Sequence, residues 1–243
     1  MTPDEFRKLG HEIVDWIADY RARVGDLPVM SRVAPGSIRA QLPAAPPDAP
    51  EGFDAVLRDL ETVILPGLSH WQHPDFFGYF PSNGELSSVL GDYLSTGLGV
   101  LGLSWQSSPA LTELEEVTTD WVRQMVGLSA AWSGVIQDTA SSSTLVALLC
   151  ARERASGFSL ARGGLQAEVA PLVVYVSSHS HSSVEKAALL AGFGRDNIRV
   201  ITADERHAMQ PEALALAIEA DLAAGRVPCA IVATSGTTTT TAF

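Results

Sequence analysis

The chain has 243 residues, 46% of them hydrophobic, which is enough to bury a core for one large domain or one and a half. Its formal net charge of −12 repels phosphate backbones and argues against nucleic-acid binding. The polar, acidic N-terminus lacks the apolar stretch of a signal peptide, and no window approaches a membrane span. We therefore expect a cytoplasmic protein that binds neither nucleic acid nor membrane.

The N-terminal part of the chain predicts helices. Thr2, Pro3 and Glu5 have the spacing of an N-cap, a proline at the first helical position and a capping-box glutamate. Apolar residues then recur at three- and four-residue spacing. The proline-rich segment 41–52 cannot be helical, and helical spacing returns over residues 53–68.

An aromatic segment follows at residues 70–84, broken by prolines and glycines. Such a segment packs irregularly or lines a cavity, and the residues alone leave both readings open. A helix is predicted from about residue 85 to 97. A longer one begins at Ser108-Pro109, with apolar side chains spaced along one inner face.

From about residue 134 strands and helices alternate. Strands are predicted at 134–137, 171–178, 198–203 and 228–235, and helices at 141–155, 182–193 and 211–225. The strands are nearly continuous apolar runs, which indicates a parallel sheet covered on both faces and an α/β fold. Ligands collect at the carboxyl ends of such strands. Three segments are therefore candidates for a site: 137–143, 178–183 and 234–241.

The first candidate segment combines a strand end with the start of a helix. Thr139, Ala140, Ser141 and Ser142 are small, so an anion can approach the free N–H groups of the first helical turn. An ordinary serine-capped helix is the alternative. Neither the dinucleotide nor the nucleoside-triphosphate glycine pattern is present.

The second and third segments carry histidines and threonines. His179 and His181 need not converge in a turn, and no third ligand stands nearby, so we predict no metal site. A histidine here can stack on a flat ligand or donate to a carboxylate, or can be structural. Gly236 ends the last strand, and the threonines after it can face a cofactor or simply form a turn. Cys150 and Cys229 lie in apolar runs and are expected to be buried free thiols.

Taken together and in this order, several segments resemble the group II pyridoxal 5'-phosphate (PLP) dependent decarboxylases, in particular the aromatic-L-amino-acid decarboxylases. The resemblance runs along the whole chain. The segments that carry it are 70–85 (HWQHPDFFGYFPSNGE), 102–115 (GLSWQSSPALTELE), 134–152 (GVIQDTASSSTLVALLCAR), 181–192 (HSSVEKAALLAG) and 232–243 (VATSGTTTTTAF).

The resemblance implies a type I PLP-dependent transferase-like fold, a mainly parallel sheet with flanking helices, preceded by an N-terminal helical segment. Residues 1–84 would form that segment and clasp the second subunit of a homodimer. Residues 85–243 would form the first part of the large domain that binds PLP.

The resemblance also implies roles for individual residues. Ala140 and Ser141 would bind the cofactor phosphate, and Thr238 would lie near the cofactor. His181 would be catalytic, against one face of the pyridine ring and near the substrate carboxylate. The substrate pocket would be lined by Trp71, Tyr79, Phe80, Pro81 and Ser82, together with Leu101 and Leu103 from the partner subunit.

The implied reaction is release of CO2 from an aromatic L-amino acid to give the arylalkylamine. Ser82 and Leu103 stand where animal relatives often carry threonine and phenylalanine, so the choice of aromatic substrate stays open. An aldehyde synthase, a decarboxylase of the same fold with another substrate, and a noncatalytic fragment acting in subunit association are the alternatives.

The family's aspartate for the pyridine nitrogen, its Schiff-base lysine and its catalytic-loop tyrosine would all lie beyond Phe243. Lys8 and Lys186, the lysines of this sequence, match neither the position nor the context of the family lysine. A C-terminal complement that carries the aspartate and the lysine is therefore expected.

Overall fold

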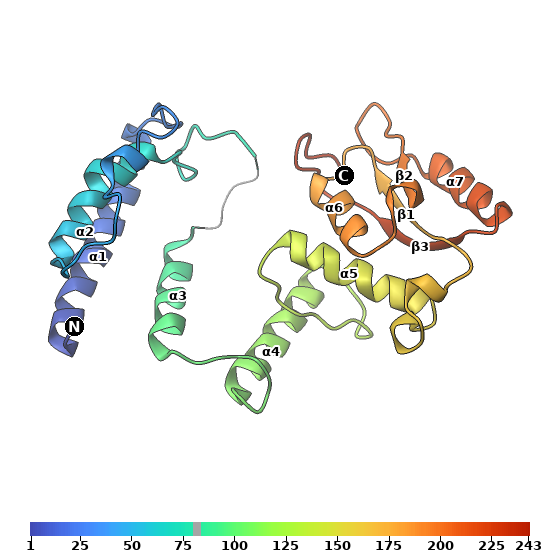
Figure 1. The fold of residues 1–243 in the computed structure, drawn as a ribbon, viewed down its shortest axis with the longest axis horizontal. Helices are drawn as coiled ribbons and strands as arrows, with labels where there is room; N and C mark the ends of the chain where they lie inside the picture. The colour runs from blue at the N-terminus through green and yellow to red at the C-terminus, as the bar shows by residue number, and fades with distance from the viewer. Residues whose placement is uncertain (80–83) are drawn as a thin grey trace. The chain divides into compact units, whose positions relative to one another are not determined.

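A computed structural model of the chain describes residues 1–79 and 84–243 (Figure 1). The chain divides into two compact units, Met1–Gly97 and Leu98–Phe243. In the described ranges, no helix has both the length and the apolar character needed to cross a membrane.

The first unit opens with α1 (Pro3–Arg23), which begins where the capping pattern predicts. The Thr2 hydroxyl accepts the Glu5 N–H at 3.2 Å, and the Thr2 N–H donates to the Glu5 carboxylate at 2.6 Å. Both halves of the capping box are present, so the predicted helix start is confirmed.

The second predicted helix of this unit has the expected extent but changes its type along the way. It starts as α2 (Phe53–Asp59), widens to a π-helix at Leu60–Ile64 and tightens to a 3-10 helix at Leu65–Gly67. Pro66 has no N–H to continue an α-helical ladder, which accounts for the narrow last turn. The helix predicted from residue 85 is confirmed as α3 (Leu86–Leu98).

Two buried histidines hold the start of the aromatic segment against α1 and the turn after it. The His70 Nδ1 lies 2.9 Å from the Tyr20 hydroxyl, and burial lowers the pKa of His70. The His73 Nε2 donates to the Gly25 carbonyl at 3.1 Å, while its Nδ1 accepts the Asp75 N–H at 2.9 Å. Both histidines of this segment are therefore structural.

The second unit is built on a parallel sheet, as predicted, but among the residues described the sheet has three strands and not the four expected from the sequence. Its strands are β1 (Leu172–Ser177), β2 (Ile198–Ile201) and β3 (Val227–Val232), in the order β2-β1-β3. The central strand β1 is buried along its whole length, which explains its unbroken apolar sequence.

Helices cover both faces of β1 (Figure 1). Val174 and Val176 pack on one face against α5 (Ala140–Ala155) and α6 (Ser182–Leu190). Val173 and Tyr175 pack on the other face against α7 (Pro211–Ala223). The α/β architecture with flanking helices and an N-terminal helical segment is confirmed. Short 3-10 helices occupy connecting segments: Val24–Asp26, Arg39–Gln41, Ser159–Ala161, Leu165–Ala167 and Arg195–Asn197.

One predicted strand, at residues 134–137, is wrong. The segment has no strand character, and Val135 and Ile136 are exposed. A strand needs a neighbour for its backbone groups, and no strand in the described ranges pairs with this segment. The Ile136 N–H donates instead to the Glu115 carboxylate at 2.6 Å.

The long helix predicted after Ser108 is confirmed as α4 (Pro109–Met125), but its apolar face is not an inner face. Leu114, Val117, Trp121, Val122 and Met125 are all exposed. The spacing of the apolar residues predicts the helix correctly. Burial of these side chains requires a packing partner, which the described residues do not provide.

The two cysteines differ from each other. Both are free, but Cys150 is exposed on α5, so the expectation that it is buried is wrong. Cys229 is half-buried in β3, and burial raises its pKa to about 11.

Candidate active site

The turn that follows β1 is tied to both neighbouring strand ends. The Ser178 N–H donates to the Ile201 carbonyl at the end of β2, at 3.0 Å. The Ser180 hydroxyl lies 3.3 Å from the Thr234 hydroxyl, two residues beyond β3. Because all three strands are parallel, their carboxyl ends meet at this edge, and the structure brings the second and third candidate segments together.

The first candidate segment forms the start of α5. Thr139 is the N-cap, and its hydroxyl accepts the Ser142 N–H at 3.1 Å. The Ser142 side chain also bonds to Asp138 and thereby lowers the pKa of that carboxyl group. Ala140 and Ser141 are exposed, and their N–H groups have no partner among the residues described.

This helix start has the properties of a phosphate site. The N–H groups of a first helical turn point outward, and the helix dipole favours a negative charge there. The small side chains of Ala140 and Ser141 leave room for a phosphate at these groups. Leu145 and Leu148 pack the helix into the apolar cluster that also contains Val184 of α6.

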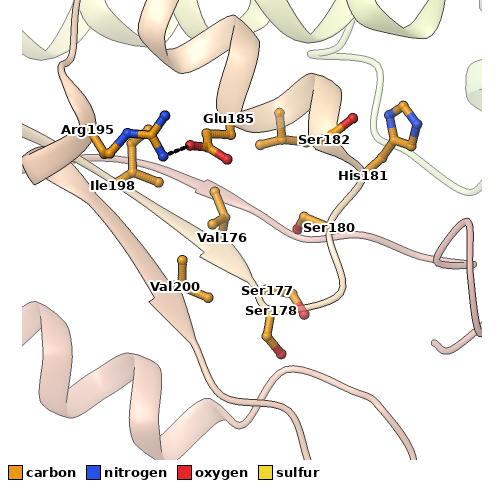
Figure 2. Close-up of a pocket in the computed structure, with 11 residues that line it drawn as sticks. Val176, Ser177, Ser178, Ser180, His181, Ser182, Glu185, Arg195, Ile198 and Val200 are labelled. Atoms are coloured by element: carbon orange, nitrogen blue, oxygen red, sulfur yellow. Dashed lines mark ion pairs between the residues drawn. The ribbon is translucent and has the colours of Figure 1, made fainter.

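His181 lies one residue before α6 and serves as its N-cap. Its Nδ1 is 3.2 Å from the Ser183 backbone nitrogen and 2.9 Å from the Ser183 hydroxyl. The ring is exposed and points away from Val176 and Val200 (Figure 2). One face of the imidazole is therefore available to a flat ligand.

A pocket of about 270 Å³ lies beside this turn, between α6 and the strands β1 and β2 (Figure 2). Val176, Ile198 and Val200 form its apolar side, and serine hydroxyls of the turn form its polar side. An ion pair between Arg195 and Glu185 stands at the end of the pocket far from His181.

The threonine run after β3 folds into a closed loop. The N–H groups of Gly236 and Thr237 both donate to the Ala242 carbonyl, at 2.8 and 3.2 Å. The buried Thr237 side chain accepts the Ala242 N–H at 3.0 Å and lies 2.6 Å from the Thr240 hydroxyl. Thr237 thus shapes the loop, a role that the sequence did not reveal. The predicted cofactor residue Thr238 is half-exposed and has no hydrogen bond in the described ranges.

Two of the residues predicted for the substrate pocket stack on each other in the first unit. The ring centroids of Trp71 and Tyr79 are 5.5 Å apart, and those of Trp71 and Phe76 are 5.0 Å apart. Phe80, Pro81 and Ser82 lie outside the described residues. Leu101 and Leu103 are exposed in the second unit.

The two histidines of the second segment separate in the structure. His179 meets His207, from the loop after β2, with ring centroids 4.8 Å apart in an edge-to-face arrangement, while His181 caps α6. Sequence spacing did not reveal the His207 contact, because the two residues come from different loops. Over the described ranges, no group of three or more histidine, cysteine or acidic side chains is placed to hold a metal ion.

Comparison with known proteins identifies the family. Residues 35–243 match the family described as the pyridoxal-dependent decarboxylase conserved domain. The chain belongs to this family. The expected resemblance is therefore confirmed, and PLP is the cofactor of the family.

Relatives in this decarboxylase family cover the whole chain. The chain is 43% identical to phenylacetaldehyde synthase of Arabidopsis thaliana, over 100% of this chain and 50% of that protein. It is 42% identical to aromatic-L-amino-acid decarboxylase of Bos taurus, over 100% of this chain and 52% of that protein. The crystal structure of Oryza sativa TDC with PLP and tryptamine superposes with a TM-score of 0.93 at 36% identity, covering 100% of this chain and 51% of that one. The chain thus spans about half the length of the relatives it matches.

Proposed function

We propose that this chain is part of a PLP-dependent decarboxylase and contributes residues to its active site. The enzyme would convert an aromatic L-amino acid to CO2 and the arylalkylamine. The observation that carries the proposal is the joined edge of the sheet. There the Ser180–Thr234 hydrogen bond holds the His181 turn beside the threonine loop. A C-terminal complement would supply the lysine and the aspartate.

The cofactor phosphate would bind at the start of α5. The free N–H groups of Ala140 and Ser141 offer two donors, and both residues are exposed. Thr238 would face the cofactor from the loop after β3, because its hydroxyl is not used within that loop.

His181 would position both the cofactor ring and the substrate carboxylate. When bound, PLP accepts into its ring the electron pair that departing CO2 leaves on the substrate Cα. The exposed imidazole, fixed at the start of α6, would limit tilting of that ring and donate a hydrogen bond to the substrate carboxylate. This hydrogen bond would orient the substrate so that its Cα–carboxylate bond, the bond that breaks, stands perpendicular to the ring plane.

The substrate side chain would be aromatic. Trp71 and Tyr79 present stacked rings, which favour a planar apolar group, and Phe80, Pro81 and Ser82 would extend this wall. Leu101 and Leu103 would complete the pocket of the partner subunit in a homodimer, which fits their exposure in the single chain. The names of the relatives point the same way, since they include an aromatic amino-acid decarboxylase and a complex with tryptamine.

An aldehyde synthase is the second candidate, because one relative of similar identity carries the name phenylacetaldehyde synthase. The two activities differ in product. The complete enzyme, meaning this chain joined to its C-terminal complement, would be loaded with PLP and given L-tryptophan, L-tyrosine, L-phenylalanine and L-DOPA in turn. We expect one equivalent of CO2 per arylalkylamine formed. An arylacetaldehyde in place of the amine would select the alternative, and no CO2 from any of the four would contradict both.

Substitution of His181 tests its proposed role in the same enzyme. His181→Ala should lower kcat by about 10²- to 10⁴-fold, the range for a positioned group that acts on the reacting centre. His181→Asn keeps an acceptor for capping α6 and should lose a similar factor, which separates loss of the ring from loss of the cap. His179→Ala, in the same turn, is the matched control. Near-normal turnover in both His181 variants would show that the histidine is structural.

A further inference from the structure

The contacts of His181 determine which of its ring nitrogens carries the proton. Its Nδ1 lies 3.2 Å from the Ser183 backbone nitrogen, whose N–H can only donate. Nδ1 must therefore be an acceptor and, in the neutral ring, the proton sits on Nε2. The Ser183 hydroxyl, 2.9 Å from the same Nδ1, then also donates to it.

This use of a histidine is unusual in its local context. Serine is a preferred N-cap residue, and Ser180 and Ser182 flank His181 on either side. The helix nevertheless begins with the imidazole as its cap. Both contacts to Nδ1 come from Ser183, the second residue of α6, so the start of this helix sets the orientation of the ring.

We infer that Ser183 is a positioning residue that fixes His181 as the Nε2–H tautomer and so presents a single donor, Nε2–H, to the substrate carboxylate. This inference rests on the proposed function of the site. Its physical consequence is specific, because a neutral ring can lie against the positively charged pyridine ring of the cofactor without charge repulsion. The same ring keeps one hydrogen bond for the carboxylate.

The tautomer can be measured on this chain without cofactor or activity. Nitrogen NMR of the chain labelled with ¹⁵N-histidine distinguishes a protonated from an unprotonated ring nitrogen. The spectrum is recorded at about pH 8, above the ordinary histidine pKa of about 6.5. The resonance that disappears in His181→Asn identifies His181. We expect Nδ1 unprotonated and Nε2 protonated, and a predominantly Nδ1–H ring would overturn the inference.

Variants at position 183 test the contribution of the hydroxyl. Ser183→Ala leaves the backbone donor but removes the hydroxyl, so the Nδ1–H population should rise several-fold, while Ser183→Thr should preserve the wild-type tautomer. Ser182→Ala is the control for the spectrum, because the Ser182 hydroxyl has no hydrogen-bond partner in the described chain. A wild-type tautomer in the Ser183→Ala chain would overturn the role of the Ser183 hydroxyl and assign the tautomer to the Ser183 backbone N–H alone.

Kinetics of the complete enzyme then connect the tautomer to turnover. Ser183→Ala should lower kcat by the same factor by which it lowers the Nε2–H population, with little change in KM, since a ring in the other tautomer offers no donor to the carboxylate but leaves the pocket intact. Ser183→Thr should restore most of the loss, and equal losses in both variants would contradict the inference. If the complete enzyme does not decarboxylate, the proposed function fails while the tautomer measurement still stands.

Discussion

The sheet at β1 and the segment from Leu98 to Ile136 are both rich in apolar residues, yet the two regions differ completely in burial. Val173, Val174 and Tyr175 in β1 are 0% exposed, whereas Leu103 is 81% exposed. The difference is not one of residue type. The β1 side chains from Leu172 to Val176 pack against helices α5, α6 or α7, while α4 and the loop before it present their apolar side chains to solvent.

This contrast in burial distinguishes the cofactor side of the proposed site from its substrate side. The cofactor side, at the strand ends, stands on a core that the chain builds by itself. On the substrate side, Leu101 and Leu103 belong to the uncovered region. An uncovered run of large apolar side chains is typical of an interaction surface, which supports the proposal that a second subunit and the C-terminal complement cover it.

A large loss of stability is expected when the polar part of the sheet region is disrupted. Asp221 is 5% exposed, accepts the Tyr175 hydroxyl at 3.1 Å and pairs with Arg199 at 2.6 Å. Hydrogen bonding from Arg199 lowers the pKa of Asp221. Asp221→Ala would leave Arg199 without its carboxylate partner and the buried Tyr175 hydroxyl without its acceptor. We expect the free energy of unfolding to fall by about 3 kcal/mol, the low end for a broken buried pair, because the Arg199 side chain is 27% exposed.

Urea denaturation followed by circular dichroism measures this loss in the 243-residue chain. Glu219→Ala, on the exposed side of the same helix, is the control and should stay within about 0.5 kcal/mol of the wild type. A similar small change for Asp221→Ala would mean that the ion pair does not stabilise the sheet region, and the contrast between the regions would then rest on apolar packing alone.

A matched pair of leucines compares the regions directly. Leu148 on α5 is 3% exposed, and Leu114 on α4 is 60% exposed. Leu148→Ala should cost about 2–5 kcal/mol through lost burial and a cavity, whereas Leu114→Ala should stay within about 0.5 kcal/mol. Urea melts at two protein concentrations check both values. A large, concentration-dependent cost for Leu114→Ala would show that copies of the chain cover the α4 face in solution.

Local patterns predicted most of the fold because their causes are local. The capping box at Thr2 depends on residues within one helical turn. The three apolar runs predict strands because side chains on both faces of a covered parallel sheet are apolar. The strand expected at 134–137 failed because a strand exists only with a pairing partner, which no local pattern supplies. The exposure of α4 has the same cause, since its periodicity reports which face is apolar and not what lies against it.

For the candidate site as well, the sequence predicted the features with local causes and missed those that depend on contacts between distant loops. The strand expected before α5 is absent, but the start of α5 and the ends of β1 and β3 were predicted from chain order and sheet topology. The Ser180–Thr234 bond, the His179–His207 contact and the buried Thr237 were not, because each depends on how loops distant in sequence meet or close. The His181 cap was hidden for another reason: imidazole is an uncommon cap, and the serines on either side of it offered more usual ones.

The smallest of the predicted losses in stability concerns the Tyr175 hydroxyl in the sheet core. Burial and the hydrogen bond to Asp221 raise the pKa of Tyr175 from 10.0 to about 12. Tyr175→Phe removes that hydrogen bond but leaves Asp221 paired with Arg199, so the free energy of unfolding near pH 7 should fall by about 1.5 kcal/mol. Because the folded-state pKa is the higher one, this stabilisation is complete below pH 10 and is lost as the pH rises from 10 to about 12.

The difference in stability between the wild type and Tyr175→Phe should therefore be constant from about pH 7 to about pH 9.5 and shrink above it. Tyr20, whose pKa burial also raises, is present in both chains and cancels in the difference. Urea melts at intervals across this range give the comparison. A difference that stays flat to about pH 12 would mean that the Tyr175 hydroxyl titrates equally in the folded and unfolded chain. The core around β1 would then open enough to expose the Tyr175 hydroxyl to solvent, although this side chain is 0% exposed in the structure.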